Sequence, residues 1–297
     1  MPDLPNPIDF AVPGFVALVL IEMLWQRRRK ADAFCPADTR TSMLLGLGNS
    51  VAAILFGGLA FAAAMGLWRF RLATVPWTWW AWGLCFVLDD LSYYWVHRWG
   101  HRIRFMWASH VVHHSSRFYN LSTALRQTWT GFFGIGLLAK LPLLLAGFHP
   151  AMIAFCGAIN LIYQFWIHTE AIRRFPPWVE AVMNTPSHHR VHHATNPRYL
   201  DRNYAGVFIV WDKLFGSFEP ERDDEACTYG LVKQIGHFNV VKAAFHEWVA
   251  MARDVWAAQG LRQKWTAFYA PPGSLTGDSA DVLRKRWEHT TELSSRA

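Results

Sequence analysis

Five apolar stretches run along this chain of 297 residues, each near the roughly 20 residues that a helix needs to cross a bilayer. They run Ile8–Trp25, Leu44–Trp68, Pro76–Val96, Trp129–Phe148 and Pro150–Ile167. The last two are joined only around Gly147–Pro150, which indicates a tight helical hairpin, one that need not cross fully. We therefore predict an all-α integral membrane bundle with about four to five membrane helices.

The polar residues between these stretches predict an orientation. The basic run Arg27–Lys30 follows the first stretch, and the positive-inside rule places it in the cytosol, with the N-terminus outside. Counting crossings, the third stretch ends in the cytosol just before His97, and the hairpin returns there just before His168. We expect a multi-pass protein of the inner or cell membrane whose remaining chain is cytosolic.

The C-terminal part shows a different pattern. One helical face would carry Val241, Phe245, Trp248, Ala252 and Val255, which is typical of an amphipathic helix. That face could lie in the headgroup layer or dock on the protein core, and we expect docking. The tail after it is polar.

These patterns divide the chain into three parts. We expect residues 1–75 to form N-terminal membrane helices, residues 76–220 to form a second domain that carries the histidine motifs described below, and residues 221–297 to form a cytosolic C-terminal helix and tail. The N-terminus carries Asp and Pro in place of a basic segment, so we expect no cleavable signal peptide.

Composition supports a membrane protein. Hydrophobic residues make up 52% of the chain and charged residues 17%, with 17 Trp and 21 Phe available for membrane interfaces. The net charge of +7 indicates a basic face toward anionic lipid, with no nucleic-acid partner. Four scattered cysteines without a CxxC pair favour four unrelated thiols over a disulfide framework or a thiolate metal site.

Histidines carry the candidate chemistry. Most of the 14 histidines are clustered, in one HxxxH pattern, two HxxHH patterns, one position directly before the second of these and one position at a predicted span end. In order, these residues are His97, His101, His110, His113, His114, His168, His188, His189, His192 and His193. The remaining four, at positions 149, 237, 246 and 289, are isolated, and we expect them to be solvated or packed without metal.

The spacing of the clustered histidines predicts metal binding. Residues three and four apart share one helix face, so two imidazoles can converge on one ion. Adjacent histidines point in different directions, so one HxxHH segment could serve two neighbouring ions. Nine or ten histidines are too many for one ion and about right for two. All lie on the cytosolic side of the predicted membrane, so we expect a histidine-rich di-metal cap there.

A carboxylate near the end of the third stretch is a further candidate. Asp90 lies seven residues before His97, two helical turns away on the same face. A carboxylate so placed could accept the ring N–H of a ligand histidine. A helix-end carboxylate that simply reaches water is the alternative.

These motifs resemble the fatty acid hydroxylase and sterol desaturase superfamily of membrane non-haem di-iron enzymes. The resemblance covers about Asp90–Glu219 and includes DLSYYWVHRWGH, WASHVVHHSSRFYNLSTALRQTW, QFWIHTE and NTPSHHRVHHATNP. It implies two iron ions, O2 and a membrane lipid substrate. The implied ligands are His97, His101, His110, His113, His114, His168, His189, His192 and His193. His188 is implied as a further ligand or a group behind the ligands.

Two segments, HHSSRFYNLSTALRQ and NTPSHHRVHH, look most like the members that hydroxylate the carbon beside the ether oxygen of glyceryl ethers. That likeness implies tetrahydrobiopterin, or else an external electron-donor protein, as reductant. This chain is shorter than those members, and we expect it to lack their additional C-terminal spans.

Alternatives of two kinds stay open. Within the superfamily, the substrate could be a sterol or a fatty acyl lipid, and the product an alcohol or an alkene. A non-enzymatic membrane metal-binding or transport protein is the alternative of another class. Transporters place their ligands near the bilayer midplane, whereas these histidines lie just beyond the predicted span ends.

Overall fold

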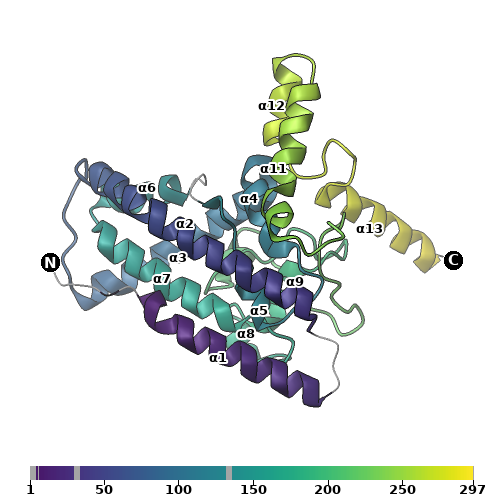
Figure 1. Ribbon diagram of the computed structural model, residues 1–297, viewed down its shortest axis with the longest axis horizontal. Coiled ribbons are helices and arrows are strands. Elements are labelled where there is room, and N and C mark those ends of the chain that lie inside the picture. Colours follow the sequence, from purple (N-terminus) through teal and green to yellow (C-terminus); the bar gives the residue numbers. More distant parts are fainter. Residues whose placement is uncertain (1–4, 6, 30–33, 132–135, 297) are drawn as a thin grey trace.

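The computed structural model describes residues 5, 7–29, 34–131 and 136–296, and within these ranges the regular structure is entirely helical. Figure 1 shows long helices side by side in a bundle, with shorter helices and loops gathered at one end. The helices are α1 (Pro7–Arg28), α2 (Pro36–Trp68), α3 (Trp79–Arg102), α4 (Arg104–His114), α5 (Leu121–Ala124), α6 (Gly136–Ala146), α7 (Pro150–Trp166), α8 (Pro177–Glu180), α9 (Pro186–His193), α10 (Val210–Leu214), α11 (Val240–Ala257), α12 (Leu261–Tyr269) and α13 (Ala280–Arg296).

Two helices, α1 and α2, are long and apolar enough to cross a membrane. Their outward faces expose large apolar side chains such as Phe10, Ile54 and Leu59, with Ile54 80% exposed. Contiguous apolar surface of this kind suits a bilayer and is costly in water. The first two predicted stretches are therefore helices of sufficient length, although α2 begins eight residues earlier than expected.

The third predicted stretch extends further than the sequence pattern indicated. Helix α3 continues through His97 and His101 and ends at Arg102, and the backbone of the next residue, Ile103, is extended. The boundary expected just before His97 is therefore not a helix end. As a result, the first two histidines are held on the last two turns of a long, rigid helix.

The predicted hairpin is shorter than a full crossing. Of the stretch Trp129–Phe148, the described helix α6 covers 11 residues, and residues 132–135 lie outside the described part. Helix α7 has 17 residues. Between them, Gly147 has a φ of +107°, and a Cβ there would lie 2.1 Å from the Ala73 carbonyl oxygen, so only glycine fits this turn.

The core between α3, α6 and α7 contains a buried ion pair. Cys85, Leu144 and Met152 pack together with no more than 1% of their surfaces exposed. Beside them the Lys140 ammonium donates to the Asp89 carboxylate, so the lysine that interrupts the fourth stretch has a partner on α3. Pairing reduces the cost of keeping both charges in an apolar bundle.

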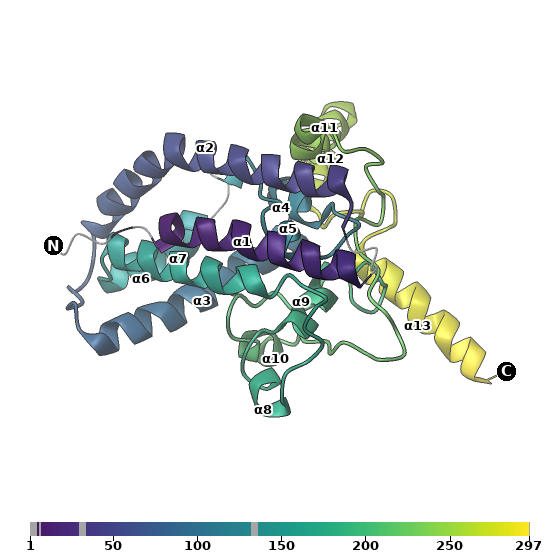
Figure 2. The same cartoon turned by 60° about the horizontal axis from the view of Figure 1, so that its bottom comes forward.

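The C-terminal helices leave the bundle. In both cartoon views α13 runs away from the long helices, while α11 and α12 form a pair that projects to one side (Figures 1 and 2). Helix α11 docks on α4 as expected, but through Ala243, Ala244 and Met251. The predicted docking face is therefore wrong in part, because Val241 and Phe245 remain exposed.

Candidate metal centre

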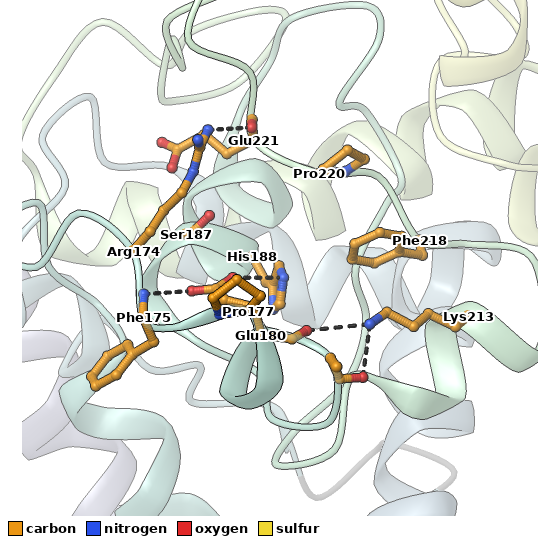
Figure 3. Close-up of a pocket in the computed structure, with 11 residues that line it drawn as sticks. Arg174, Phe175, Pro177, Glu180, Ser187, His188, Lys213, Phe218, Pro220 and Glu221 are labelled. Carbon is orange, nitrogen blue, oxygen red and sulfur yellow. Dashed lines mark hydrogen bonds and ion pairs between the residues drawn. The ribbon is translucent and has the colours of Figure 1, made fainter.

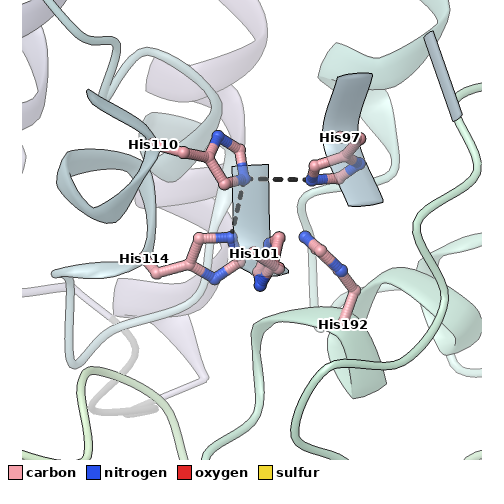
Figure 4. Close-up of side chains that lie close together, drawn as sticks. All are labelled: His97, His101, His110, His114 and His192. Carbon is pink, nitrogen blue, oxygen red and sulfur yellow. Dashed lines mark hydrogen bonds between the residues drawn. The ribbon is translucent and has the colours of Figure 1, made fainter. Parts of the chain in front are cut away.

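Four segments bring nine histidines together at one end of the bundle. They come from the end of α3, from α4, from the turn that follows α7, and from α9. The first group contains His97, His101, His110, His114 and His192. The second group contains His113, His168, His189 and His193. In each group one nitrogen per histidine lies within 4.8 Å of all the others, and Figure 4 shows the first group.

Each HxxHH segment divides its histidines between the two groups. On α4, His114 joins the first group while its neighbour His113 joins the second. On α9, His192 joins the first and His193 the second. The rings of His114 and His193 stack with centroids 4.4 Å apart, so the two groups are in direct contact through these rings. The prediction that adjacent histidines serve two neighbouring sites is consistent with this geometry.

Backbone carbonyl groups orient four of the imidazoles. The Nδ1 atoms of His97 and His168 each lie 2.7 Å from a carbonyl oxygen, of Tyr204 and Gln164 respectively. His192 Nδ1 and His113 Nδ1 lie 3.0 Å and 3.3 Å from the carbonyl oxygens of Arg202 and Arg126. A carbonyl oxygen only accepts, so each Nδ1 carries the proton. In a neutral ring, the lone pair is then on Nε2, which points into the group.

Two of these lone pairs, on His113 Nε2 and His192 Nε2, face no protein donor. His113 Nε2 and His168 Nε2 lie 3.2 Å apart, yet each is an acceptor, so no hydrogen bond can join them. In the first group, the buried Nε2 atoms of His101 and His192 have no hydrogen-bond partner in the described structure. Converging, buried acceptors without donors are unfavourable unless a cation binds between them, so both groups fit metal ions.

Burial keeps these ligands neutral. It lowers the pKa of His113 to about 4, an effect that the hydrogen bond to the Arg126 carbonyl only partly offsets. Burial likewise lowers the pKa of His192 well below its ordinary value. At neutral pH both imidazoles are therefore unprotonated at Nε2, the form that binds a metal.

A short loop after α9, residues 201–204, supplies partners for three histidines of the first group. The Asp201 carboxylate lies 3.3 Å from His101 Nδ1, and the loop carbonyls of Arg202 and Tyr204 are those described above. Asp201 and Asn203 have φ values of +56° and +55°, in the left-handed region. Left-handed residues thus alternate with ordinary ones, which lets the carbonyl groups of Arg202 and Tyr204 reach different rings. The sequence pattern did not identify this loop.

Two buried polar side chains hold the 201–204 loop in place. The Asp212 carboxylate accepts hydrogen bonds from the backbone N–H groups of Tyr204 and Ala205, both at 2.8 Å. The Asn203 amide donates to the carbonyl oxygens of His188 and Glu219. Both side chains are fully buried. The loop is thus fixed to α9 and α10 by hydrogen bonds that are shielded from water.

Asp90 supports the segment after this loop, which differs from the sequence-based expectation. Its carboxylate accepts from the N–H groups of Val207 and Phe208, from the Trp211 indole and from the Asn160 amide, at 2.7–3.0 Å. The His97 ring, its expected partner, is bound to a carbonyl of the loop instead. Asp90 therefore contacts the histidines only through the backbone, because that backbone lies between the carboxylate and the ring.

His188 points away from the two groups. Its Nε2 lies 2.9 Å from the Glu180 carboxylate, and its Nδ1 lies 3.5 Å from the Thr185 hydroxyl. Of the two roles implied for it, the geometry favours a group behind the ligands, next to His189.

A cavity of about 430 Å³ lies on this side of α9 (Figure 3). Its lining includes His188 but none of the nine grouped histidines. The charged groups in its wall are paired within the protein, Glu180 with His188 and Lys213 with two backbone carbonyls. It is therefore separate from the histidine groups.

Buried histidines in paired groups at the end of an apolar helical bundle define a class of membrane-associated, histidine-rich proteins suited to metals. Residues 82–217 of this chain match the family model described as fatty acid hydroxylase. The resemblance identified from the histidine motifs is thereby confirmed.

Individual proteins of known name are also similar to this chain in sequence. The chain is 37% identical to alkylglycerol monooxygenase of Danio rerio over 289 residues, which cover 94% of this chain and 64% of the relative. It is 38% identical to the Homo sapiens alkylglycerol monooxygenase, covering 91% of this chain and 60% of the relative. An ornithine lipid hydroxylase of Rhizobium tropici is 26% identical, covering 74% of this chain and 67% of that protein. The chain thus spans less than two thirds of the length of the alkylglycerol monooxygenases, and no solved structure matches it.

Proposed function

We propose that this protein is an O2-dependent lipid monooxygenase of the membrane, with an ether lipid of the alkylglycerol type as substrate. The observation that carries the proposal is the pair of buried histidine groups whose Nε2 atoms converge, with no protein donor for those of His101, His113 and His192. The names of the relatives, alkylglycerol monooxygenase and ornithine lipid hydroxylase, support lipid hydroxylation.

The nine grouped histidines are proposed to hold two iron ions. Two nitrogens bound about 2.1 Å from one ion are about 3.0 Å apart at a right angle and about 3.4 Å apart in a tetrahedron. In the second group, successive Nε2 atoms of His113, His168, His189 and His193 are 3.2, 2.9 and 3.2 Å apart. These spacings fit either geometry and place the four rings close enough to share one ion; the choice of iron rests on the family resemblance.

When bound and reduced, the iron pair would supply the O2 chemistry that oxidises an unactivated C–H bond. One oxygen atom then enters the substrate and the other leaves as water, with two electrons from tetrahydrobiopterin or another external donor. The protein orients the imidazoles through backbone carbonyls, keeps them neutral by burial and excludes water from the groups.

Asp90 and His188 are proposed to position ligands. Asp90 fixes the backbone that follows the 201–204 loop, and through it the carbonyl that orients His97. His188, held by Glu180, fixes the start of α9 beside His189. Neither side chain needs to contact the substrate in this account.

The proposed location follows from the apolar helices. Helices α1 and α2 would span the membrane, and α3 together with the α6–α7 hairpin would complete a multi-pass bundle. The basic residues after α1 favour a histidine cap facing the cytosol. There, at the interface, the upper part of a lipid chain can reach the two groups.

An incubation under 18O2 tests the proposed reaction. The purified chain, loaded with iron and supplied with a reduced pterin, is given a glyceryl ether, a sterol and an acyl lipid in parallel. Hydroxylation beside the ether oxygen gives a hemiacetal that collapses to glycerol and an aldehyde, so 18O should appear in the aldehyde, trapped at once as its alcohol to prevent exchange with water. Label only in a hydroxylated acyl chain or sterol would replace the ether-lipid assignment, and unlabelled products throughout would remove the monooxygenase assignment.

A further inference from the structure

Helix α11 carries an exposed apolar stripe that its docking does not use. Val241, Phe245 and Val249 follow one another at four-residue spacing, and Trp256 lies two turns further on the same face. Their side chains are 57%, 37%, 46% and 89% exposed, respectively. The opposite side of the same helix is buried against α4. The stripe therefore faces outward, away from the protein.

The stripe is continuous with the apolar outer face of α2. The Phe245 ring meets the Trp129 ring edge to face, with centroids 6.0 Å apart. The Trp129 indole donates to the Leu45 carbonyl of α2 and lies against Gly48, where a Cβ would come within 2.2 Å of it. Around this contact, Leu44, Leu47 and Val51 of α2 are exposed by 41–62%. The surface that would face lipid on α2 therefore continues onto α11.

The charges of α11 are arranged to suit a lipid surface. Its two acidic side chains, Glu247 and Asp254, both pair with Arg104 of α4 on the docked side. Two cationic side chains, Lys242 and Arg253, are exposed beside the stripe. Apolar and aromatic side chains flanked by exposed cations are typical of helices that lie in the headgroup layer of anionic membranes.

We propose that the Val241–Trp256 stripe of α11 lies in the headgroup layer of the membrane and contacts anionic phospholipid. Because α11 packs on α4, which carries His110, His113 and His114, this contact sets the height of the histidine groups relative to the lipid headgroups. The inference concerns membrane contact and does not depend on which lipid is oxidised.

Spin labelling of the full chain in nanodiscs of neutral and anionic phospholipid tests this contact. Labels are placed at Val249→Cys and Trp256→Cys, after Cys35 and Cys227 have been changed to Ser. Leu59→Cys, exposed on α2, is the lipid reference, and His289→Cys, exposed on α13, is the water reference. Both stripe labels should be more accessible to O2 than to a water-soluble nickel complex, as at the lipid reference.

Accessibility like that of the water reference at both stripe positions would overturn the proposal. Dipolar broadening between labels on two copies, with protection from both reagents, would also overturn it and assign the stripe to a second copy of the chain. Metal content equal to that of the unlabelled protein shows that each variant is folded.

Discussion

His113 and His168 turn two nitrogen lone pairs toward each other across 3.2 Å. Each ring donates its only proton, from Nδ1, to a backbone carbonyl, so neither Nε2 can donate to the other. The carbonyl of Arg126 and the helical carbonyl of Gln164 thus determine what the second histidine group can bind. A positive ion is the natural partner for such a pair.

The first prediction concerns metal content. We expect the purified chain to hold about two iron ions, because nine imidazoles exceed what one ion needs. His113→Ala and His168→Ala should each lower iron sharply, as measured by elemental mass spectrometry. His289→Ala, on the exposed surface of α13, is the matched control. Equal iron in all three variants would contradict the ligand assignment.

The second prediction concerns Asp90. Asp90→Asn places an amide N–H₂ group where the carboxylate now accepts four hydrogen bonds, so the segment at Val207 and Phe208 should shift. Metal affinity should fall by about 10–100-fold, as is usual for losses behind metal ligands. Competition with a chelator measures this effect.

Gly206→Ala tests the same support from the other side. A Cβ at Gly206 would lie 2.7 Å from the Asp90 carboxylate and from the Asn160 amide oxygen, so it should weaken metal binding in the same direction. Asp224→Asn, which changes a carboxylate on the surface, should leave affinity unchanged. If Asp90→Asn behaves like Asp224→Asn, Asp90 does not position the ligands.

The third prediction concerns stability. The Arg126 guanidinium pairs with Asp38 at 3.0 Å, and their side chains are 1% and 4% exposed. Removing one partner of a buried pair leaves the other charge without compensation, so Asp38→Ala should lower the free energy of unfolding by roughly 3–5 kcal/mol. Thermal unfolding in detergent would report this as a lower Tm.

Asp223 provides the comparison for that measurement. It pairs with Arg173 and Arg174 at the surface, where it is 65% exposed. Asp223→Ala should cost no more than about 1 kcal/mol. Similar Tm values for Asp38→Ala and Asp223→Ala would show that the buried Asp38–Arg126 pair does not stabilise the protein.

The fourth prediction concerns orientation. Leu72, 90% exposed between α2 and α3, should react as a cysteine only with reagents outside the cell. Asp224→Cys, near the histidine end of the bundle, should react only with reagents that enter the cytosol. The basis is the cluster of basic residues after α1. Labelling of both positions from the same side would contradict the proposed crossing count.

The histidine groups could be predicted from the sequence, whereas the backbone carbonyl groups that orient their rings could not. Spacings of three and four residues determine which rings share a helix face, and adjacent histidines necessarily diverge. The carbonyl groups of Arg202 and Tyr204 have no such signature, because every residue has a carbonyl. The only local signal was Asp and Asn at 201 and 203, residue types that tolerate a left-handed backbone.

The partner of Asp90 and the docked face of α11 were missed for a related reason. Periodicity places Asp90 and His97 on one face of α3, but a backbone segment far away in sequence lies between them. On α11, small residues such as Ala243 and Ala244 pack closely on α4, while the larger apolar residues stay outside. A hydrophobic pattern ranks residues by size and polarity, and close helix packing can favour small ones.

One peptide bond joins His113 to His114, and another joins His192 to His193, and each bond connects the two histidine groups. The separation of the groups is therefore limited at two places by the main chain itself. Two metal ions held in these groups would therefore be joined through the main chain by two separate covalent links.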